Sequence, residues 1–254
     1  MADRRLKNLK SEISNLKSAM KRGPAIKKEA TEKRMGLFGG TFNPIHLGHL
    51  RGAEEIREAF GLEEVVFIPA AIPPHKAVEE VIDARHRLEM VRLATAINPS
   101  FSTSDIELSR PGKSYSIDTI RYFREKKPDG LFFILGREAF VEIETWKEFE
   151  TLFSLCHFIV MTRPGFQKTP PLSQLPKTLI PAFRYDQKIE AWIHLSGHSL
   201  YFKEITFLDI SSTKVRELIE RGESVRYLIP AEVEAYVQRQ GLYRREPCKV
   251  HGKS

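Results

Sequence analysis

The sequence predicts an α/β fold: a Rossmann-like, doubly wound and mostly parallel sheet with a small C-terminal helical part. From Met35 onward, short apolar runs rich in β-branched and aromatic residues alternate with longer stretches of helical periodicity. A chain of 254 residues, 41% of them hydrophobic, can fill the core of one sizeable domain. Strands that alternate with helices form a parallel sheet covered on both faces, and ligands then bind at the carboxyl ends of the strands.

The predicted elements follow from this alternation. Short apolar runs predict strands at residues 36–40, 65–70, 101–108, 131–136, 157–163 and 204–209. Stretches of helical periodicity between them predict helices at residues 48–60, 83–97, 117–126 and 138–155. Two more helices, 212–221 and 231–240, close the chain, and Gly222 and Gly241 follow them as C-terminal stops. The proline-rich residues 164–203 predict a long loop with a hairpin around Ser196-Gly197.

The excess positive charge lies in the first 34 residues. They hold eleven Lys and Arg against four acids, which equals the net charge of +7 of the whole chain. The segment is polar and interrupted at Gly23-Pro24, so it predicts a flexible basic extension, either a disordered appendage or an over-extended start before Met35. A nucleic-acid or membrane tether is the alternative. Residues 35–245 are then the folded domain, and residues 246–254 a C-terminal tail.

The body from Met35 onward is formally neutral, so anion recognition there must come from local geometry. The two cysteines, Cys156 and Cys248, form neither a CxxC pair nor a disulfide framework, which is typical of a reduced cytosolic protein. No apolar run is long enough to cross a bilayer, and no hydrophobic segment follows the N-terminal charges. We expect a soluble, cytoplasmic protein.

A phosphate-binding turn is predicted after the first strand. The segment GLFGGTFNPIHLGH, residues 36–49, ends a strand, turns on two glycines and starts a helix near Pro44. The N–H groups of the helix N-terminus attract an anion, and Gly39 and Gly40 let a phosphate approach the main chain. The sequence therefore predicts an anion site at this turn.

His46 and His49 lie three residues apart at the helix entrance, so both rings face the same side and can donate hydrogen bonds to phosphate oxygens. Gly48 between them is expected to leave a bare surface for a flat base. For an isolated HxxH, a helix-capping pair or half of a zinc site is the alternative. The adjacent GGTF turn favours the phosphate interpretation.

The string GGTFNPIHLGHL resembles the first motif of the nucleotidylyltransferase superfamily, and in this longer form the nicotinate-nucleotide adenylyltransferases in particular. The resemblance implies adenylyl transfer from ATP to nicotinate mononucleotide, which gives deamido-NAD and pyrophosphate in NAD biosynthesis. It implies that His46 and His49 are catalytic. It also assigns ATP binding to residues of the turn and its flank: Gly39, Gly40, Thr41, Phe42 and Gly48.

Three further segments fit ATP-binding positions of the same family. PPHK, residues 73–76, follows the second strand and places Lys76 at the carboxyl edge of the sheet, although alone it is only a turn. ISSTKVR, residues 210–216, resembles the motif that holds the β and γ phosphates, with helix capping alone as the alternative. An Arg-Pro-Gly turn fits the adenine end, unless it is only a surface turn. The implied residues are Lys76, Arg163, Ile210, Ser211, Ser212 and Thr213 for ATP, and Arg216 for catalysis.

Two segments point to the pyridine half. SYSIDT, residues 114–119, resembles an element whose amides and hydroxyls meet the nicotinate carboxylate, with Ser116 where Thr is usual. Gly136-Arg-Glu138, with Trp146 downstream, resembles a GxD element whose Trp stacks on the pyridine ring; Glu138 replaces the usual Asp, and core packing is the alternative for the Trp. The resemblance implies a pyridine-nucleotide set of Tyr115, Ser116, Thr119, Gly136, Glu138 and Trp146.

The implied mechanism is in-line attack of the mononucleotide 5′-phosphate on the α-phosphorus of ATP, which needs no activated Ser or Cys. The Gly112-Lys113-Ser114 string is no Walker A ending, because Glu107 stands where that motif requires glycine. We expect Mg²⁺ on the ATP phosphates and no protein-ligated metal. The expected partners are ATP and nicotinate mononucleotide, with no membrane and with only a weak polyanion contact by the basic tail.

Three alternatives stay open. The first is an adenylyltransferase for nicotinamide mononucleotide or phosphopantetheine. The second is a fragment of a class I aminoacyl-tRNA synthetase, although SSTKVR stands where a KMSKS loop is required. The third is a non-catalytic nucleotide or nucleic-acid binder.

Overall fold

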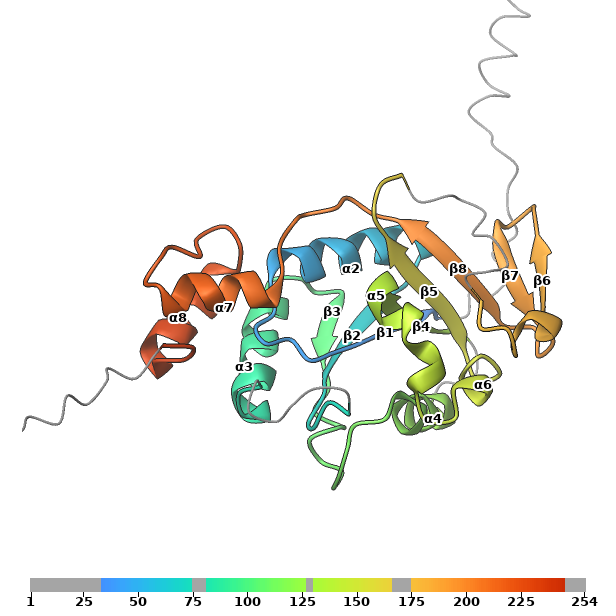
Figure 1. The fold of residues 1–254 in the computed structure, drawn as a ribbon, viewed down its shortest axis with the longest axis horizontal. Helices are drawn as coiled ribbons and strands as arrows, with labels where there is room; N and C mark the ends of the chain where they lie inside the picture. The colour runs from blue at the N-terminus through green and yellow to red at the C-terminus, as the bar shows by residue number, and fades with distance from the viewer. Residues whose placement is uncertain (1–32, 75–80, 127–129, 166–174, 245–254) are drawn as a thin grey trace, which may run out of the picture. The chain divides into compact units, whose positions relative to one another are not determined.

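The computed structural model describes residues 33–74, 81–126, 130–165 and 175–244, and an eight-stranded sheet organises them (Figure 1). The strand order is β3-β2-β1-β4-β5-β8-β7-β6. Strands β1 (Met35–Gly40), β2 (Glu64–Pro69), β3 (Phe101–Thr103), β4 (Leu131–Gly136), β5 (His157–Thr162) and β8 (Ser199–Glu204) run parallel. The chain moves outward from β1 to β3 and returns to the other side of β1 with β4, which confirms the predicted doubly wound, mostly parallel sheet.

Helices cover both faces of this sheet. The helices are α2 (Leu47–Phe60), α3 (Ala84–Thr95), α4 (Ser116–Lys126), α5 (Arg137–Val141), α6 (Phe149–Leu152), α7 (Ser212–Glu220) and α8 (Ala231–Gln240). The short 3₁₀ helices are η2 (Ile143–Thr145) and η4 (Ile180–Ala182). The helices α2, α3, α4, α7 and α8 lie within about two residues of their predicted bounds, because their apolar periodicity and caps are strong local signals.

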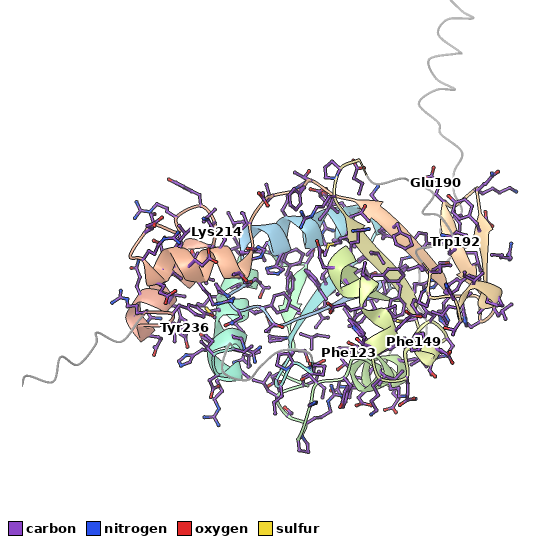
Figure 2. The ribbon with its side chains drawn as sticks, in the orientation of Figure 1. Phe123, Phe149, Glu190, Trp192, Lys214 and Tyr236 are labelled. Atoms are coloured by element: carbon purple, nitrogen blue, oxygen red, sulfur yellow. The ribbon has the colours of Figure 1, made fainter. Side chains whose placement is uncertain are left out.

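The core has two parts, one on each face of the sheet. Successive residues of β1 point to opposite faces, so Leu37 packs on one side with Ile117 and Ile120 of α4, whereas Phe38 packs on the other. Phe123 of α4 and Phe149 of α6 belong to the first part (Figure 2). The second part contains residues of α2, α3, α7 and α8, among them Ile56, Met90, Val215 and Val233.

Two predicted strands differ from the structure in their bounds. The prediction of a strand at 204–209 was wrong, because the strand here is β8 and it ends at Glu204, where its parallel neighbour β5 also ends. The strand predicted at 101–108 is reduced to β3, since only residues 101–103 pair with β2 and the chain then turns, with Ser109 N donating to Asp105 O.

The helix predicted at 138–155 is broken. It consists of α5, η2 and α6, because Trp146 has an extended backbone and Glu148 has a φ of 51°. A continuous helix is excluded by these two conformations. The indole of Trp146 packs edge-on against Phe133 of β4, with ring centroids 6.1 Å apart. The apolar periodicity of the sequence does not predict this break, because the break arises from the packing of Trp146 against the sheet.

The region predicted as a long loop, 164–203, contains three strands in its described part. Strand β7 (Ala191–His194) pairs antiparallel with β8, and β6 (Phe183–Asp186) pairs antiparallel with β7 at the edge of the sheet. The hairpin predicted around Ser196-Gly197 is confirmed, since it joins β7 to β8 and Gly197 adopts a φ of 92°. Residues 166–174 lie outside the described residues.

Several predictions fall on residues that the structure does not describe. These are Lys76, Cys248, the C-terminal tail and all but residues 33 and 34 of the basic extension, so the domain bounds stay a prediction. Within the described ranges, no helix is both long enough and apolar enough to span a membrane.

The packing under the first turn leads to a stability prediction. Phe67 of β2 is fully buried and contacts the rings of Phe38, Phe42 and Phe101. Phe67→Ala should lower the free energy of unfolding by about 3–5 kcal/mol, because it removes buried contacts and leaves a cavity. Urea denaturation measures this change. Ile97→Ala is the control, since Ile97 is 77% exposed and its loss should cost less than about 0.5 kcal/mol. Equal losses in the two variants would contradict this packing.

Candidate functional site

A cleft of about 490 Å³ opens at the carboxyl ends of β1 and β4, on either side of the point where the strand order reverses. Of the predicted site residues, nine line it: Gly39, Gly40, Thr41, His49, Tyr115, Ser116, Gly136, Glu138 and Trp146. The fold therefore brings the predicted phosphate turn and both predicted pyridine segments to one cavity.

His46 and His49 form a stacked pair at the start of α2. Their ring centroids are 3.6 Å apart and the ring planes differ by 28°. The main-chain N–H of His46 donates to His49 Nδ1 at 3.2 Å. Because Nδ1 accepts this hydrogen bond, the proton of a neutral His49 ring lies on Nε2. His49 lines the cleft.

His46 is only 7% exposed, and among the described residues its buried Nδ1 has no hydrogen-bond partner. Burial lowers the pKa of His46 to about 4, so the ring is neutral near pH 7. The ring of His46 packs closely against Gly48, because a Cβ at this position would lie 3.0 Å from His46 Nδ1. Gly48 itself is partly exposed, so the surface for a flat base that the sequence predicts there stays a prediction.

An aromatic floor supports the turn. Phe42 is buried, and its ring lies edge-on to His49 at 5.1 Å between centroids. A Cβ at Gly40 would lie 2.8 Å from the Phe42 ring, so this glycine admits the close contact. Phe42 therefore cannot present its side chain to a ligand in this arrangement, and only its main chain remains for the ATP contact that the sequence predicts.

Helix α7 joins the first turn from the far end of the sequence. Ser212 Oγ donates to Pro44 O at 2.8 Å, and Arg216 Nη1 donates to Asn43 O at 2.8 Å. Ser211 caps α7, because its Oγ accepts from Lys214 N at 3.1 Å. The segment therefore caps α7 through Ser211 and also binds the first turn through Ser212 and Arg216. Ile210, Ser211, Ser212, Thr213 and Arg216 are not among the residues that line the described cleft.

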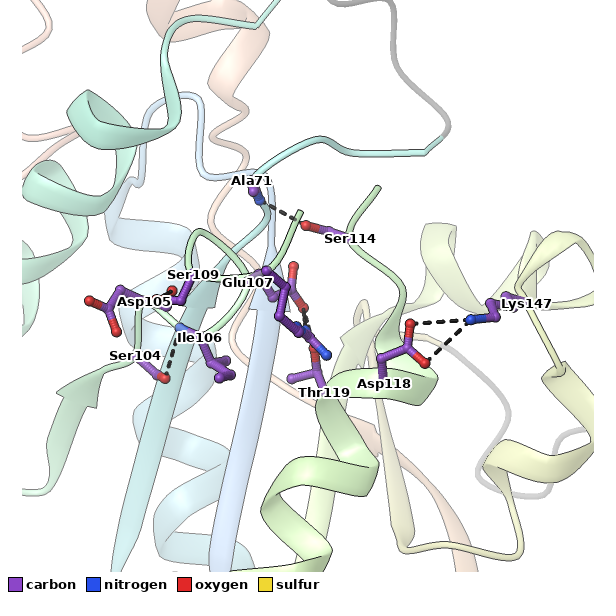
Figure 3. Close-up of polar contacts among 11 residues, drawn as sticks. Ala71, Ser104, Asp105, Ile106, Glu107, Ser109, Ser114, Asp118, Thr119 and Lys147 are labelled. Carbon is purple, nitrogen blue, oxygen red and sulfur yellow. Dashed lines mark hydrogen bonds and ion pairs between the residues drawn. The ribbon is translucent and has the colours of Figure 1, made fainter. Parts of the chain in front are cut away.

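On the opposite side, hydrogen bonds hold the SYSIDT segment beside β2 (Figure 3). Ala71 N donates to Ser114 Oγ at 2.8 Å, and Ser114 N donates to Ile72 O at 3.0 Å. Thr119 does not line the cleft: it is 1% exposed, and its hydroxyl donates to Glu107 Oε1 at 2.6 Å. The direct pyridine contact predicted for Thr119 is therefore not available in this arrangement.

Trp146 is positioned for both roles that the sequence left open, core packing and contact with a ligand in the cleft. It is half-buried against the core and also lines the cleft. Gly136 and Glu138 lie nearby at the end of β4. Arg163 Nη2 pairs with Glu138 Oε1 at 2.9 Å, and its guanidinium lies 4.3 Å from the Phe207 ring centroid. Arg163 and Glu138 thus form a pair at the outer rim, where both side chains are mostly exposed.

Sequence reasoning missed several residues around the cleft, among them Glu107, Lys147 and Arg87. Glu107 and Lys147 line it, and Lys147 also pairs with Asp118 at 3.3 Å. Burial raises the pKa of Glu107, although hydrogen bonds from Thr119 and Ser114 oppose this shift. Arg87 of α3 is fully buried and donates hydrogen bonds to the loop after β1, at Thr41 O, and to the loop after β2, at Ala71 O. No local pattern marks these residues, and Arg87 lies within an ordinary amphipathic helix.

Comparison with known proteins agrees with this geometry. The family model described as cytidylyltransferase-like matches residues 37–218. A probable nicotinate-nucleotide adenylyltransferase of Geobacter metallireducens is 47% identical over 214 residues, which cover 84% of this chain and 99% of that protein. A second, from Geobacter sp. strain M21, is 49% identical over 211 residues, which cover 83% of this chain and 98% of that protein.

This chain belongs to the nicotinate-nucleotide adenylyltransferases. Its fold is similar to that of the nicotinic acid mononucleotide adenylyltransferase of Plasmodium falciparum complexed with NaAD, with a TM-score of 0.62 at 20% identity. That match covers 83% of this chain and 97% of the other. At this identity the structural similarity supports the fold of the family, and the sequence relatives support the membership.

The buried histidine leads to a prediction on pH. The pKa of His46 is lowered from 6.5 to about 4, so between these values the unfolded chain binds a proton on His46 that the folded chain does not. The free energy of unfolding therefore falls as the pH is lowered through this window. In His46→Asn, which lacks this titration, the loss between about pH 7 and about pH 4.5 should be about 2 kcal/mol smaller than in the wild type. Urea denaturation at the two pH values measures it, and equal losses would show that His46 titrates normally.

Proposed function

We propose that this enzyme transfers the adenylyl group of ATP to nicotinate mononucleotide, giving nicotinate adenine dinucleotide and pyrophosphate in NAD biosynthesis. The single observation that carries the proposal is the contact of α7 with the phosphate turn. Ser212 and Arg216 hydrogen-bond to the main chain of residues 43 and 44, directly before the histidine pair. The two segments that the family resemblance assigns to one triphosphate are therefore neighbours in space.

The attacking group is the 5′-phosphate of the mononucleotide. One of its oxygens forms a bond to the α-phosphorus of ATP, the bond from that phosphorus to the α,β-bridging oxygen breaks, and pyrophosphate leaves with the bonding electrons. The protein then has to position both substrates and stabilise charge on the phosphoryl oxygens. This role requires donors and fixed geometry rather than a protein nucleophile.

His49 is proposed to donate from Nε2 to an α-phosphate oxygen, because its Nδ1 accepts from His46 N. His46 is neutral and stacked on His49, so it fixes that ring and adds a donor without adding a full charge. Charge comes instead from Arg216, whose guanidinium keeps further N–H groups besides the one that Asn43 O accepts. The hydroxyls of Ser211, Ser212 and Thr213 and the side chain of Lys76 are proposed to hold the β and γ phosphates.

Mg²⁺ is proposed to enter as part of the substrate MgATP. Within the described ranges, no three His, Cys, Asp or Glu side chains are grouped so that they could hold a metal ion. An ion that arrives on the phosphates and keeps much of its water needs no such group.

The acid form of the mononucleotide is favoured by the cleft wall. The N-terminus of α4 begins at Ser116, and the first N–H groups of a helix have no acceptor within it. Lys147 lines the same wall, with its ammonium 4.9 Å from the Tyr115 ring centroid. A nicotinate carboxylate would meet N–H donors and a nearby positive charge here, and the pyridine ring would lie against Trp146.

A first prediction concerns the proposed donor. His49→Ala should lower kcat by about 10²–10³-fold, because a lost donor to developing charge costs this much in comparable sites. A pyrophosphate-release assay with ATP and nicotinate mononucleotide measures it. His86→Ala is the matched control, since His86 bonds to Tyr236 OH at 2.9 Å outside the cleft and should change kcat less than about twofold. A His49→Ala enzyme with near wild-type kcat would remove His49 from the mechanism.

A second prediction concerns the mononucleotide. With the wild-type enzyme, kcat/KM for nicotinate mononucleotide should exceed that for nicotinamide mononucleotide by at least about tenfold, since the helix N-terminus and Lys147 favour the carboxylate. Lys147→Met should reduce this ratio. The same assay with both mononucleotides measures the ratio, and a preference for the amide would assign the enzyme to the other substrate.

A further inference from the structure

Arg87 is the largest fully buried side chain among the described residues, with 1% exposure. A guanidinium is charged at every ordinary pH, and it donates through a rigid, planar set of N–H groups. Here Nη1 donates to Thr41 O at 2.8 Å, Nη2 to Ala71 O at 3.0 Å, and Nε to Ile82 O at 3.0 Å. All three acceptors are main-chain carbonyls, so Arg87 holds backbone rather than side chains.

Two of these acceptors follow neighbouring parallel strands. Thr41 directly follows β1 in the phosphate turn and lines the cleft, and Ala71 follows β2. The fork of Arg87, formed by Nη1 and Nη2, therefore joins the segments at the carboxyl ends of β1 and β2. The β-sheet itself no longer fixes their separation beyond Ala70, whose N–H donates to Gly40 O at 2.9 Å.

The chain of contacts continues from Ala71 to the pyridine side. Ala71 N donates to Ser114 Oγ, and Ser114 lies two residues before Ser116, where α4 begins. Glu107 is 7% exposed, lines the cleft and accepts from the Thr119 hydroxyl, to which Arg110 also donates (Figure 3). Hydrogen bonds thus connect the phosphate turn, through Arg87, Ala71 and Ser114, with the segment that leads into α4.

We propose that Arg87 is a positioning residue that fixes the distance between the ATP-binding turn and the mononucleotide-binding segment. It contacts neither substrate and acts through the main chain of Thr41 and Ala71. The inference rests on the proposed function, in which these two segments hold the two reactants. In-line attack requires the reacting atoms to meet at a short and defined distance, so a loosened connection lowers the reaction rate more than the binding of either substrate.

The test compares Arg87→Met with the wild type at a temperature well below both melting points. Arg87→Met keeps an unbranched apolar side chain but loses the fork, so kcat should fall about tenfold or more while KM for each substrate changes less than about threefold. Arg87→Lys is the second variant in case Arg87→Met does not fold. Its single ammonium cannot reproduce the fork between the two carbonyls, so a kcat reduction of about tenfold is expected again.

Thr95→Val is the control for a general loss of stability. Thr95 lies on the same helix, is 4% exposed, and donates from Oγ1 to Val91 O at 2.9 Å, but it touches neither loop. It should lower the melting temperature and leave kcat within about twofold of the wild type. If Thr95→Val lowers kcat as much as Arg87→Met, the effect is general and the positioning role is overturned.

A double-mutant cycle tests the connection itself. Ser114→Ala interrupts the same network at its other end, so Arg87→Met combined with Ser114→Ala should lower kcat by less than the product of the two single effects. Independent, multiplicative effects overturn the proposal, as does an Arg87→Met enzyme with kcat within twofold of the wild type.

A second readout separates this inference from the proposed function. Wild-type protein without turnover on ATP and nicotinate mononucleotide would reject the proposed function alone. Hydrogen exchange of the Ala71 amide, which donates to Ser114, still reports the network: it should exchange at least about tenfold faster in Arg87→Met and unchanged in Thr95→Val. Unchanged exchange in Arg87→Met would overturn the positioning role.

Discussion

Two hydrogen bonds from α7 to the main chain of the first turn are the contact on which the candidate site depends. Ser212 and Arg216 reach the carbonyls of Pro44 and Asn43 across more than half of the chain. Tyr243 adds a third tie, since its OH donates to Asn43 Oδ1 at 2.9 Å. Because two of the three acceptors are main-chain carbonyl oxygens, these contacts fix the path of the backbone, and the path decides where the histidine pair lies.

The strand topology explains why this contact can form. The strand order reverses between β1 and β4, so the turn after β1 and the segment after β4 diverge and leave a cleft between them. The chain crosses the sheet once more with β8 before it enters α7, which packs Val215 into the core on the α2 side. Because β8 runs in the same direction as β1, its carboxyl end lies at the same edge of the sheet as the first turn, and α7 follows from there.

The polar residues of the site fall into two groups, those that are buried and those that face the cleft. His46, Thr119 and Arg87 are buried and hold other groups, whereas His49 and Glu138 face the cleft. A buried guanidinium bonded only to carbonyls and a buried hydroxyl bonded to a carboxylate give rigidity, because a loss of their partners would leave unsatisfied polar groups. The residues that face the cleft can then meet a ligand without reorganisation of the frame around them.

The sequence by itself determined the parallel α/β fold, the five longer helices and the segments that carry the site, because periodicity, glycines and caps are local signals. Only the tertiary structure decided that Thr119 turns to Glu107, that the ring of His46 packs against Gly48, and that Arg87 joins two loops. It also decided the short strands β6 and β7 and the break at Trp146. These features arise from contacts between residues distant in the chain, and no pattern within one segment records which partner will lie across from it.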